Sequence, residues 1–394
     1  MRAIFACLLG LAVLLASRGR AAGAINESGP LFTRASTAAS VPAEVSNHVM
    51  CVNVLINGQG PFRMLVDTGC SFSMISPEVA DAVEARGLNT EDEDVEAVNG
   101  LGDVVSTPRV VLESITVGSI RFEGVVAGVV PLELQSKIDG RALDGILGYS
   151  LFSDLFVGLD YRNQRLQLSE QWPTGLPPVR AVLATVEQDE VPFITAKIQG
   201  RDFRLMVDTG ANDRVHLSPD LIGDLTWKVE PRPGVMLAVA GETAREKIGR
   251  LEGTLELGQL QQLDPVIEIS AGTPTIGIGL LQPYILVFHQ SEEKLWLCSA
   301  IDGPIPSPPE LTVGLSLFAE ANGWRIAGII PNSPAEAAGI KGGDLVTAIE
   351  GQPAHGWTRD QIQNWIDTHP AIALKVVSGA VEHDFSLRVW DLVP

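Results

Sequence analysis

Two stretches of the sequence, INGQGPFRMLVDTGCSFSMISPEV at residues 56–79 and IQGRDFRLMVDTGANDRVHLSPDL at residues 198–221, resemble each other and decide the predicted fold. In each stretch an Asp-Thr-Gly turn follows three apolar residues that are typical of a buried strand. One such tripeptide would be only an ordinary turn after a strand. Two copies in register, in repeat units of roughly 130 to 140 residues, indicate duplicated domains. A pseudo-twofold axis between these domains would bring Asp67 and Asp208 into one site.

A pair of adjacent carboxyl groups predicts acid–base chemistry. Two carboxylates within hydrogen-bond reach cannot both ionise cheaply, so Asp67 and Asp208 would share one proton over a wide pH range. The ionised partner would deprotonate a water toward a carbonyl carbon, while the protonated partner would donate to the developing oxyanion. This chemistry hydrolyses an amide without a metal, another cofactor or a covalent intermediate.

The residues that follow each aspartate suit a braced loop. The hydroxyls of Thr68 and Thr209 can brace the opposing loops. Gly69 and Gly210 allow the backbone to approach the carboxyl groups closely.

Both copies continue alike after the loops. Each has a turn sequence between strand-like runs, NGLGD at residues 99–103 and VAGET at residues 239–243. Each then has a β-rich run that contains an apolar-Gly motif, at residues 144–168 and 275–297.

Over residues 46–300, the two Val-Asp-Thr-Gly loops and the DGILG segment at residues 144–148 resemble the aspartic protease clan. The doubling in one chain is similar to pepsin, whereas each half is closer to retropepsin, whose subunit is a single such lobe. The resemblance implies a mainly β fold with two duplicated β-barrel lobes, at residues 46–176 and 177–302. It also implies aspartic-type endopeptidase activity. In the family the apolar-Gly motif backs the catalytic loop; residues 146–148 match it well and residues 276–277 only approximately.

The two turn sequences stand where the family has flaps that close over substrate and exclude water. The resemblance assigns flap roles to Asn99, Gly100, Gly102, Ala240 and Gly241. Ser71 follows the family habit of a hydroxyl after the first loop, which the second loop lacks.

The sequence departs from the family in two ways. Neither flap contains the tyrosine that pepsins use, because the tyrosines of the chain are Tyr149, Tyr161 and Tyr284. Asn212 stands where retroviral enzymes carry an acid that binds the substrate backbone, and an amide could still bond there with altered preference.

Loss of activity in duplicated domains is an open alternative. The chain would then be a catalytically silent scaffold whose activity is peptide or protein binding.

A third unit follows a proline-rich linker at residues 303–310. Residues 311–394 predict strands with two helices, one capped by Ser333 and one by Thr358. This unit resembles a PDZ domain, including those attached to exported bacterial proteases. The resemblance implies that a carboxylate loop and the adjoining strand receive a C-terminal peptide. It assigns this binding to Val313, Gly314, Leu315 and Leu317, and the alternative that the groove only packs on the protease lobes stays open.

Composition narrows the function classes. The 394 residues exceed one compact core, so several domains are expected. A net charge of -20 disfavours nucleic acid and anionic lipid. The chain has 39 Gly and 25 Pro, which suits many short strands joined by tight turns.

The N-terminal residues 1–24 have the layout of a secretory signal, which predicts a periplasmic or secreted protein. Arg18 and Arg20 follow the apolar run, so an uncleaved membrane anchor is the alternative. No other segment is apolar enough to span a bilayer. Residues 25–45 are predicted to be a linker or leader. As an alternative, this segment could occlude the active-site cleft until it is removed.

The remaining candidates favour structural roles. Three cysteines, Cys51, Cys70 and Cys298, lie beyond the signal, and their odd number gives no indication of a disulfide framework. Cys70 is expected to be buried rather than reactive. His216 is expected to be structural or exposed rather than a catalytic base. No zinc or nucleophile-elbow signature is present.

Overall fold

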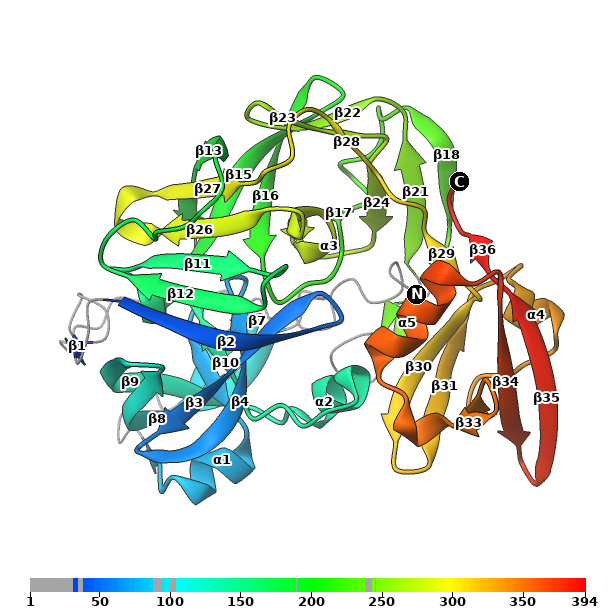
Figure 1. Cartoon of the computed structure of the whole chain (residues 1–394), viewed down its shortest axis with the longest axis horizontal. Helices are drawn as coiled ribbons and strands as arrows, with labels where there is room; N and C mark the ends of the chain where they lie inside the picture. The colour runs from blue at the N-terminus through cyan, green and yellow to red at the C-terminus, as the bar shows by residue number, and fades with distance from the viewer. Residues whose placement is uncertain are drawn as a thin grey trace.

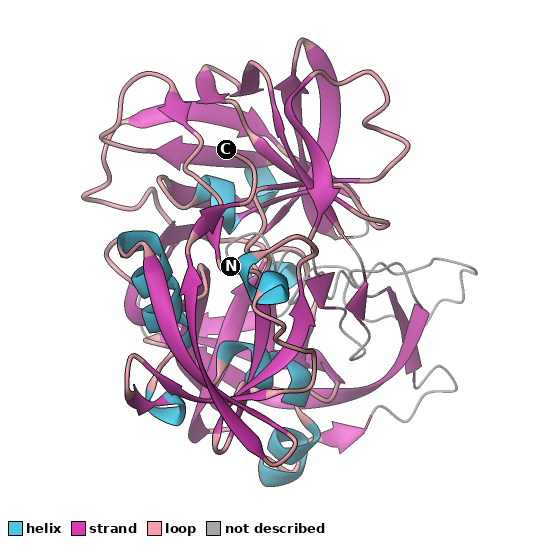
Figure 2. Ribbon diagram, turned by 90° about the vertical axis from the view of Figure 1, so that its right-hand side faces the viewer, coloured by secondary structure: helices cyan, strands magenta, loops and turns pink. Residues whose placement is uncertain are grey.

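The structure, a computed structural model, describes residues 31–34, 38–87, 94–98, 104–188, 190–234, 236–237, 243–244 and 246–394. The fold is mainly β, as predicted, with a few short helices (Figure 2). Two lobes with β4 and β16 at their centres lie side by side, and a third unit that contains α5 is packed beside them (Figure 1). No helix among the described residues has the length and apolar character needed to cross a membrane.

The first lobe is built around β4, the strand that carries the apolar residues before Asp67. Met64, Leu65 and Val66 on this strand are all buried, because the strand lies inside a 15-stranded sheet. The elements are β1 (Leu31–Arg34), β2 (Ala38–Ser46), β3 (Val49–Ile56), β4 (Gln59–Asp67), β5 (Ser73–Ile75), α1 (Pro77–Ala82), β6 (Arg86–Gly87), β7 (Asp94–Val98), β8 (Val104–Val117), β9 (Ile120–Val129), α2 (Glu133–Asp139), β10 (Gly145–Gly148), η1 (Tyr149–Phe152), β11 (Phe156–Asp160) and β12 (Arg165–Ser169).

The second lobe repeats this plan around β16, which ends at Asp208. Its strands form an 11-stranded sheet, and three further strands join the sheet of the first lobe. The elements are β13 (Val179–Ala184), β14 (Val186–Gln188), β15 (Val191–Ile198), β16 (Arg201–Asp208), β17 (Val215–Leu217), β18 (Trp227–Pro233), β19 (Met236–Leu237), β20 (Thr243–Ala244), β21 (Lys247–Leu251), β22 (Thr254–Leu257), β23 (Leu260–Leu263), β24 (Val266–Ile269), β25 (Thr275–Gly277), α3 (Ile278–Leu281), β26 (Ile285–His289), η2 (Gln290–Glu292), β27 (Lys294–Cys298) and β28 (Ile305–Pro306).

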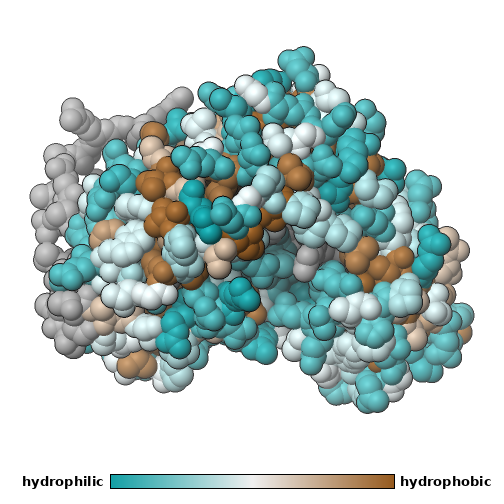
Figure 3. All heavy atoms as spheres, turned by 45° about the horizontal axis from the view of Figure 1, so that its top comes forward, coloured by the Kyte–Doolittle hydropathy of each residue, from teal (hydrophilic) through white to brown (hydrophobic). Residues whose placement is uncertain are grey.

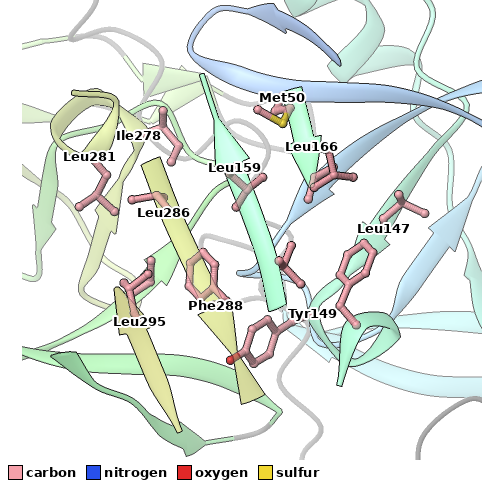
Figure 4. Close-up of a cluster of buried hydrophobic side chains, with 14 of the residues drawn as sticks. Met50, Leu147, Tyr149, Leu159, Leu166, Ile278, Leu281, Leu286, Phe288 and Leu295 are labelled. Carbon is pink, nitrogen blue, oxygen red and sulfur yellow. The ribbon is translucent and has the colours of Figure 1, made fainter. Parts of the chain in front are cut away.

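The two lobes share a run of six neighbouring strands, in the order β13-β27-β26-β11-β12-β2. The lobes join where β11 pairs antiparallel with β26, with Leu159 opposite Leu286. These leucines and Phe288 are almost fully buried, in a cluster that also contains Leu166 of the first lobe (Figure 4). Burial of each such side chain stabilises the fold by about 1.5–3 kcal/mol. The apolar β-rich runs noticed in the sequence are therefore the strands that fix the two lobes together.

The third unit has a sheet of order β30-β31-β32-β34-β35 and two α-helices, as the sequence predicted. Thr358 caps α5 with a capping box completed by Gln361. Ser333 caps α4, but the Glu336 carboxylate bonds the amide of Asn332 instead of that of Ser333. The elements are β29 (Leu311–Thr312), β30 (Leu315–Glu320), β31 (Gly323–Ile329), α4 (Pro334–Ala337), β32 (Leu345–Ile349), β33 (Gln352–Pro353), η3 (Ala354–Gly356), α5 (Arg359–Thr368), β34 (Ala371–Ser378), β35 (Val381–Arg388) and β36 (Trp390–Asp391).

The linker between the second lobe and the third unit lies on the second lobe. Its strand β28 pairs parallel with β23, and the Ser307 amide donates to the Leu263 carbonyl. Ile248 and Val266 of the second lobe belong to the same buried cluster as Val313 and Val393 of the third unit. The third unit therefore shares core contacts with the second lobe. The face drawn in Figure 3 is mostly hydrophilic, which fits the large net charge.

Candidate active site

Asp67 and Asp208 occupy equivalent positions in the two lobes. Each is the last residue of a strand, and a parallel strand backs each one. In the first lobe β10 places Gly148 opposite Asp67, and in the second lobe β25 places Gly277 opposite Asp208. The second apolar-Gly motif, expected to match only approximately, has the same register as the first.

The two Asp-Thr-Gly loops are joined by four hydrogen bonds between buried groups. The Thr209 hydroxyl donates to the Val66 carbonyl (2.9 Å) and accepts from the Thr68 amide (2.9 Å). The Thr68 hydroxyl donates to the Val207 carbonyl (2.6 Å) and accepts from the Thr209 amide (3.1 Å). Because each loop holds the other in the same way, the two aspartates are fixed relative to each other.

The carboxyl groups lie across this junction from the opposing glycines. The Gly69 amide donates to Oδ1 of Asp67 (2.8 Å), and the Gly210 amide donates to Oδ1 of Asp208 (2.9 Å). A Cβ atom added to Gly69 would lie 2.6 Å from Cγ of Asp208, and one added to Gly210 would meet the carboxyl group of Asp67. Only glycine leaves room for this approach. In the described part of the chain, Oδ2 of each aspartate has no hydrogen-bond partner.

Burial changes the acidity of both aspartates. Desolvation raises the pKa of Asp67 to about 6, although hydrogen bonds to its carboxylate oppose this change. Burial raises the pKa of Asp208 well above its usual value, and the nearby Asp67 and Asp213 raise it further. Burial therefore favours a pair that keeps one shared proton.

The strands on either side of each predicted flap are paired with each other. β7 pairs antiparallel with β8, and β19 pairs antiparallel with β20. The flap residues named from the sequence lie outside the described residues: Asn99, Gly100, Gly102, Ala240 and Gly241. Tyr149, Tyr161 and Tyr284 are buried in the hydrophobic core of the lobes.

The segment after the second loop forms a polar wall. Asn212 is 4% exposed, and neither atom of its amide has a hydrogen-bond partner within the described chain. It lines a cavity of about 160 Å³ together with His48 of the first lobe, Gln282 of the second and Pro308 of the linker. Asn212 therefore lies buried at a junction of both lobes and the linker, two residues beyond Gly210.

The other residues named from the sequence are structural in this fold. The His216 ring is fully buried and lies within hydrogen-bond distance of the Thr273 carbonyl (3.0 Å) and the Ser270 hydroxyl (2.8 Å). Ser71 is buried beside the first loop. Burial raises the pKa of the Cys70 thiol well above its usual value, so this thiol is poorly ionised and unreactive.

The predicted peptide-binding residues of the third unit are covered. Val313, Leu315 and Leu317 are at most 2% exposed, and the Gly314 amide donates to the Thr312 hydroxyl (2.9 Å). The Leu317 carbonyl on the edge strand β30 accepts from the guanidinium of Arg359 on α5 (2.6 Å).

Helix α2 of the first lobe lies beside β30. A cavity of about 900 Å³ between them is lined by Lys137, Arg141, Ala319 and Glu320 among other residues. This end of β30 therefore faces helix α2 of the first lobe across the cavity.

Sequence reasoning missed a cluster of buried charged groups in the second lobe. Asp213, Arg214, Glu246, Glu268 and Glu310 are all at most 4% exposed. Burial raises the pKa of Glu268 to about 8 and that of Glu246 well above its usual value. One signal was available, because Glu268 interrupts the apolar strand Val266–Ile269. Asp213 and Arg214 are adjacent, but Glu246 and Glu310 are far from them in the sequence, and none of these residues carries a local pattern.

The fold and the paired loops define a two-lobed aspartyl-protease-like chain with a C-terminal PDZ domain. Comparison with known families agrees with both assignments. Residues 52–151 match the family described as aspartyl protease, and residues 325–377 match the PDZ domain family. A comparison with curated proteins found no match.

Among solved structures, the chain is similar to the HtrA3 PDZ domain in a crystal structure with a phage-derived ligand. The identity is 20%, over 21% of this chain and 88% of that one, with a TM-score of 0.20.

Proposed function

We propose that the chain is an aspartic-type endopeptidase that hydrolyses peptide bonds with a water activated by Asp67 and Asp208. The observation that carries the proposal is the exchange of four hydrogen bonds between the loops, which holds two buried carboxyl groups in one site. A family match to aspartyl proteases over residues 52–151 supports the same reaction class.

The two carboxyl groups act as one base and one acid in the proposed reaction. Burial raises the pKa of both groups, which favours a single shared proton between them. The ionised member takes a proton from the attacking water, while the protonated member donates to the developing oxyanion of the scissile carbonyl. As the C–N bond of the intermediate breaks, the first member gives its proton to the leaving nitrogen and the second takes one back from the diol, so no further co-reactant is needed.

Other parts of the chain would position the substrate. The segments joined by the β7–β8 and β19–β20 strand pairs would cover the bound peptide. Export of the mature chain after residue 24 is part of the proposal, supported by the layout of the N-terminal segment.

Hydrolysis of casein and of a fluorogenic peptide library between pH 3 and pH 8 tests the proposal. Wild-type chain should cleave, a pepstatin-like statine should inhibit it, and Asp67→Asn should lose at least a thousandfold in kcat/KM. Asp202→Asn, an exposed aspartate at the start of β16, is the matched control and should keep wild-type activity. Equal activity of wild type and Asp67→Asn at every pH would refute the proposal.

Peptide capture by the PDZ domain is the second candidate function, favoured by the family match at residues 325–377. If no cleavage is found, peptide capture alone would make the chain a binding scaffold. Fluorescence polarisation with C-terminal peptides, compared with the same peptides amidated at the C-terminus, measures it. Binding that needs the free carboxylate supports this function, and equal binding of both peptide sets contradicts it.

A further inference from the structure

A buried ion pair joins the second catalytic loop to the linker of the PDZ domain. Arg214 lies four residues beyond Gly210, and its guanidinium pairs with the carboxylate of Glu310, the last residue of the linker. The two side chains are 5% and 0% exposed. Because the two residues are far apart in the sequence, the packing of the linker and of the PDZ domain on the second lobe brings them together.

The Arg214 end of this pair is bound to the strand that backs Asp208. The Arg214 carbonyl accepts from the Gly277 amide (3.2 Å), and Gly277 lies opposite Asp208 in the β16–β25 pair. Its neighbours are held in the same way, because the Ile278 amide donates to the Ala211 carbonyl (2.9 Å). A displacement of Arg214 would therefore reach the backbone that supports the catalytic aspartate.

The Glu310 end is bound to the PDZ domain. The Glu310 amide donates to Oδ1 of Asp391 (3.0 Å), and its carbonyl accepts from the Leu392 amide (2.8 Å). Both partners belong to the C-terminal segment that begins with β36. Glu310 is thus fixed through its backbone by the PDZ domain and through its side chain by the catalytic lobe.

A second arginine strengthens the same junction. The guanidinium of Arg250 on β21 donates to the Val393 carbonyl (2.6 Å) and to the Pro308 carbonyl (3.1 Å). These bonds hold the C-terminal segment and the linker against the second lobe even if the ion pair is broken. A substitution at Glu310 should therefore release Arg214 without detaching the domain.

We propose that Glu310 is a positioning residue, which holds the second catalytic loop in place through Arg214 and so couples the seating of the PDZ domain to the geometry of the aspartate pair. The proposal rests on the peptidase function proposed above. Loss of one partner of a buried ion pair leaves an uncompensated charge, whereas loss of both does not. Glu310→Gln should therefore disturb the loop more than Arg214→Gln/Glu310→Gln.

The experiment compares Glu310→Gln, Glu310→Asp and the double variant with wild-type chain by hydrogen exchange and by steady-state kinetics. Asp302→Asn is the matched control, since Asp302 lies just before the same linker and pairs with Arg180 (3.3 Å), but its side chain is 86% exposed. Exchange is followed in the fragment that contains Ile278 and Gly279, whose amides bond the 211–213 segment. Near-ultraviolet circular dichroism checks that each variant is folded.

In Glu310→Gln, exchange of the Ile278 and Gly279 amides should be at least tenfold faster, and kcat should fall at least tenfold with KM within threefold of wild type. Glu310→Asp should lie between these values, the double variant should recover part of the loss, and Asp302→Asn should match wild type. If Glu310→Gln does not fold, Glu310→Asp decides the question in the same two measurements.

Unchanged exchange in Glu310→Gln, or an equal effect of Asp302→Asn, would overturn the proposal. The exchange measurement does not require cleavage. If the wild-type chain cleaves no peptide, the function proposed above fails, while the coupling of Glu310 to the loop is still decided by exchange.

Discussion

Replacement of Thr209 by valine tests whether the hydroxyl groups fix the two catalytic loops. The threonine hydroxyl bonds two groups of the opposing loop, the Val66 carbonyl and the Thr68 amide. Valine has nearly the same shape but cannot make either bond. Both backbone groups would then be buried without a partner, because the loops lie in the interior between the lobes.

The cost follows from these two groups. A buried backbone donor or acceptor without a partner costs about 1–3 kcal/mol, so Thr209→Val should lower the free energy of unfolding by about 2–6 kcal/mol. Thr209→Ser keeps the hydroxyl and loses one methyl group, which costs about 0.8 kcal/mol. The serine variant is therefore the control that separates the hydrogen bonds from the side-chain volume.

Urea unfolding, followed by tryptophan fluorescence, and kcat on the best peptide of the library are the two measurements. Thr209→Val should unfold at lower urea and lose at least tenfold in kcat, since the aspartates are no longer held at a fixed separation. Thr68→Val should behave alike. The double variant should cost less than the sum of the two, because the loops already separate when the first hydroxyl is lost. An unfolding free energy of Thr209→Val within about 0.5 kcal/mol of Thr209→Ser would refute this reasoning.

Three further predictions concern the same site and its surroundings. Gly210→Ala should lose at least a hundredfold in kcat/KM, because the added Cβ meets the Asp67 carboxyl, whereas Gly342→Ala, with open space around its Cβ, should match wild type in the same assay. Glu246→Gln should raise the melting temperature at pH 8 but not at pH 4. Burial raises the pKa of Glu246 in the folded state, so the wild-type chain loses stability as pH rises through this folded-state pKa. The exposed residue Glu252 supplies the control variant, Glu252→Gln. Equal gains in melting temperature at both pH values would contradict the predicted direction of the pH dependence. The value of kcat/KM should rise as pH increases through about 6, where Asp67 ionises, and a maximum near pH 3 would contradict this prediction.

Much of the fold of the two lobes could be predicted, because the sequence patterns that define it are local and occur twice. Apolar residues before each Asp-Thr-Gly turn define a buried strand, and the duplication supplies the symmetry that relates the strands. The capping box at Thr358 is equally local, since it needs only residues three positions apart.

The junctions between the units could not be predicted, because they depend on pairs that are distant in sequence. Nothing near Arg214 or Glu310 indicates that each is buried, since a charged residue is usually exposed. The local sequence pattern indicates a PDZ domain, but the position of α2 beside β30 depends on how the domain is seated on the lobes.

The two catalytic loops are symmetric, but the segments that come after them are not, and this difference has a chemical consequence. Beyond the first loop the chain places Cys70 and Phe72 in a small apolar cluster. Beyond the second loop it places Asp213, whose carboxyl accepts a bond from the Thr275 hydroxyl (2.7 Å). Burial raises the pKa of both aspartates, and the nearby Asp67 and Asp213 raise that of Asp208 further. The duplicated fold thus creates the pair, and the divergence of the residues just after the loops gives its two members different electrostatic surroundings.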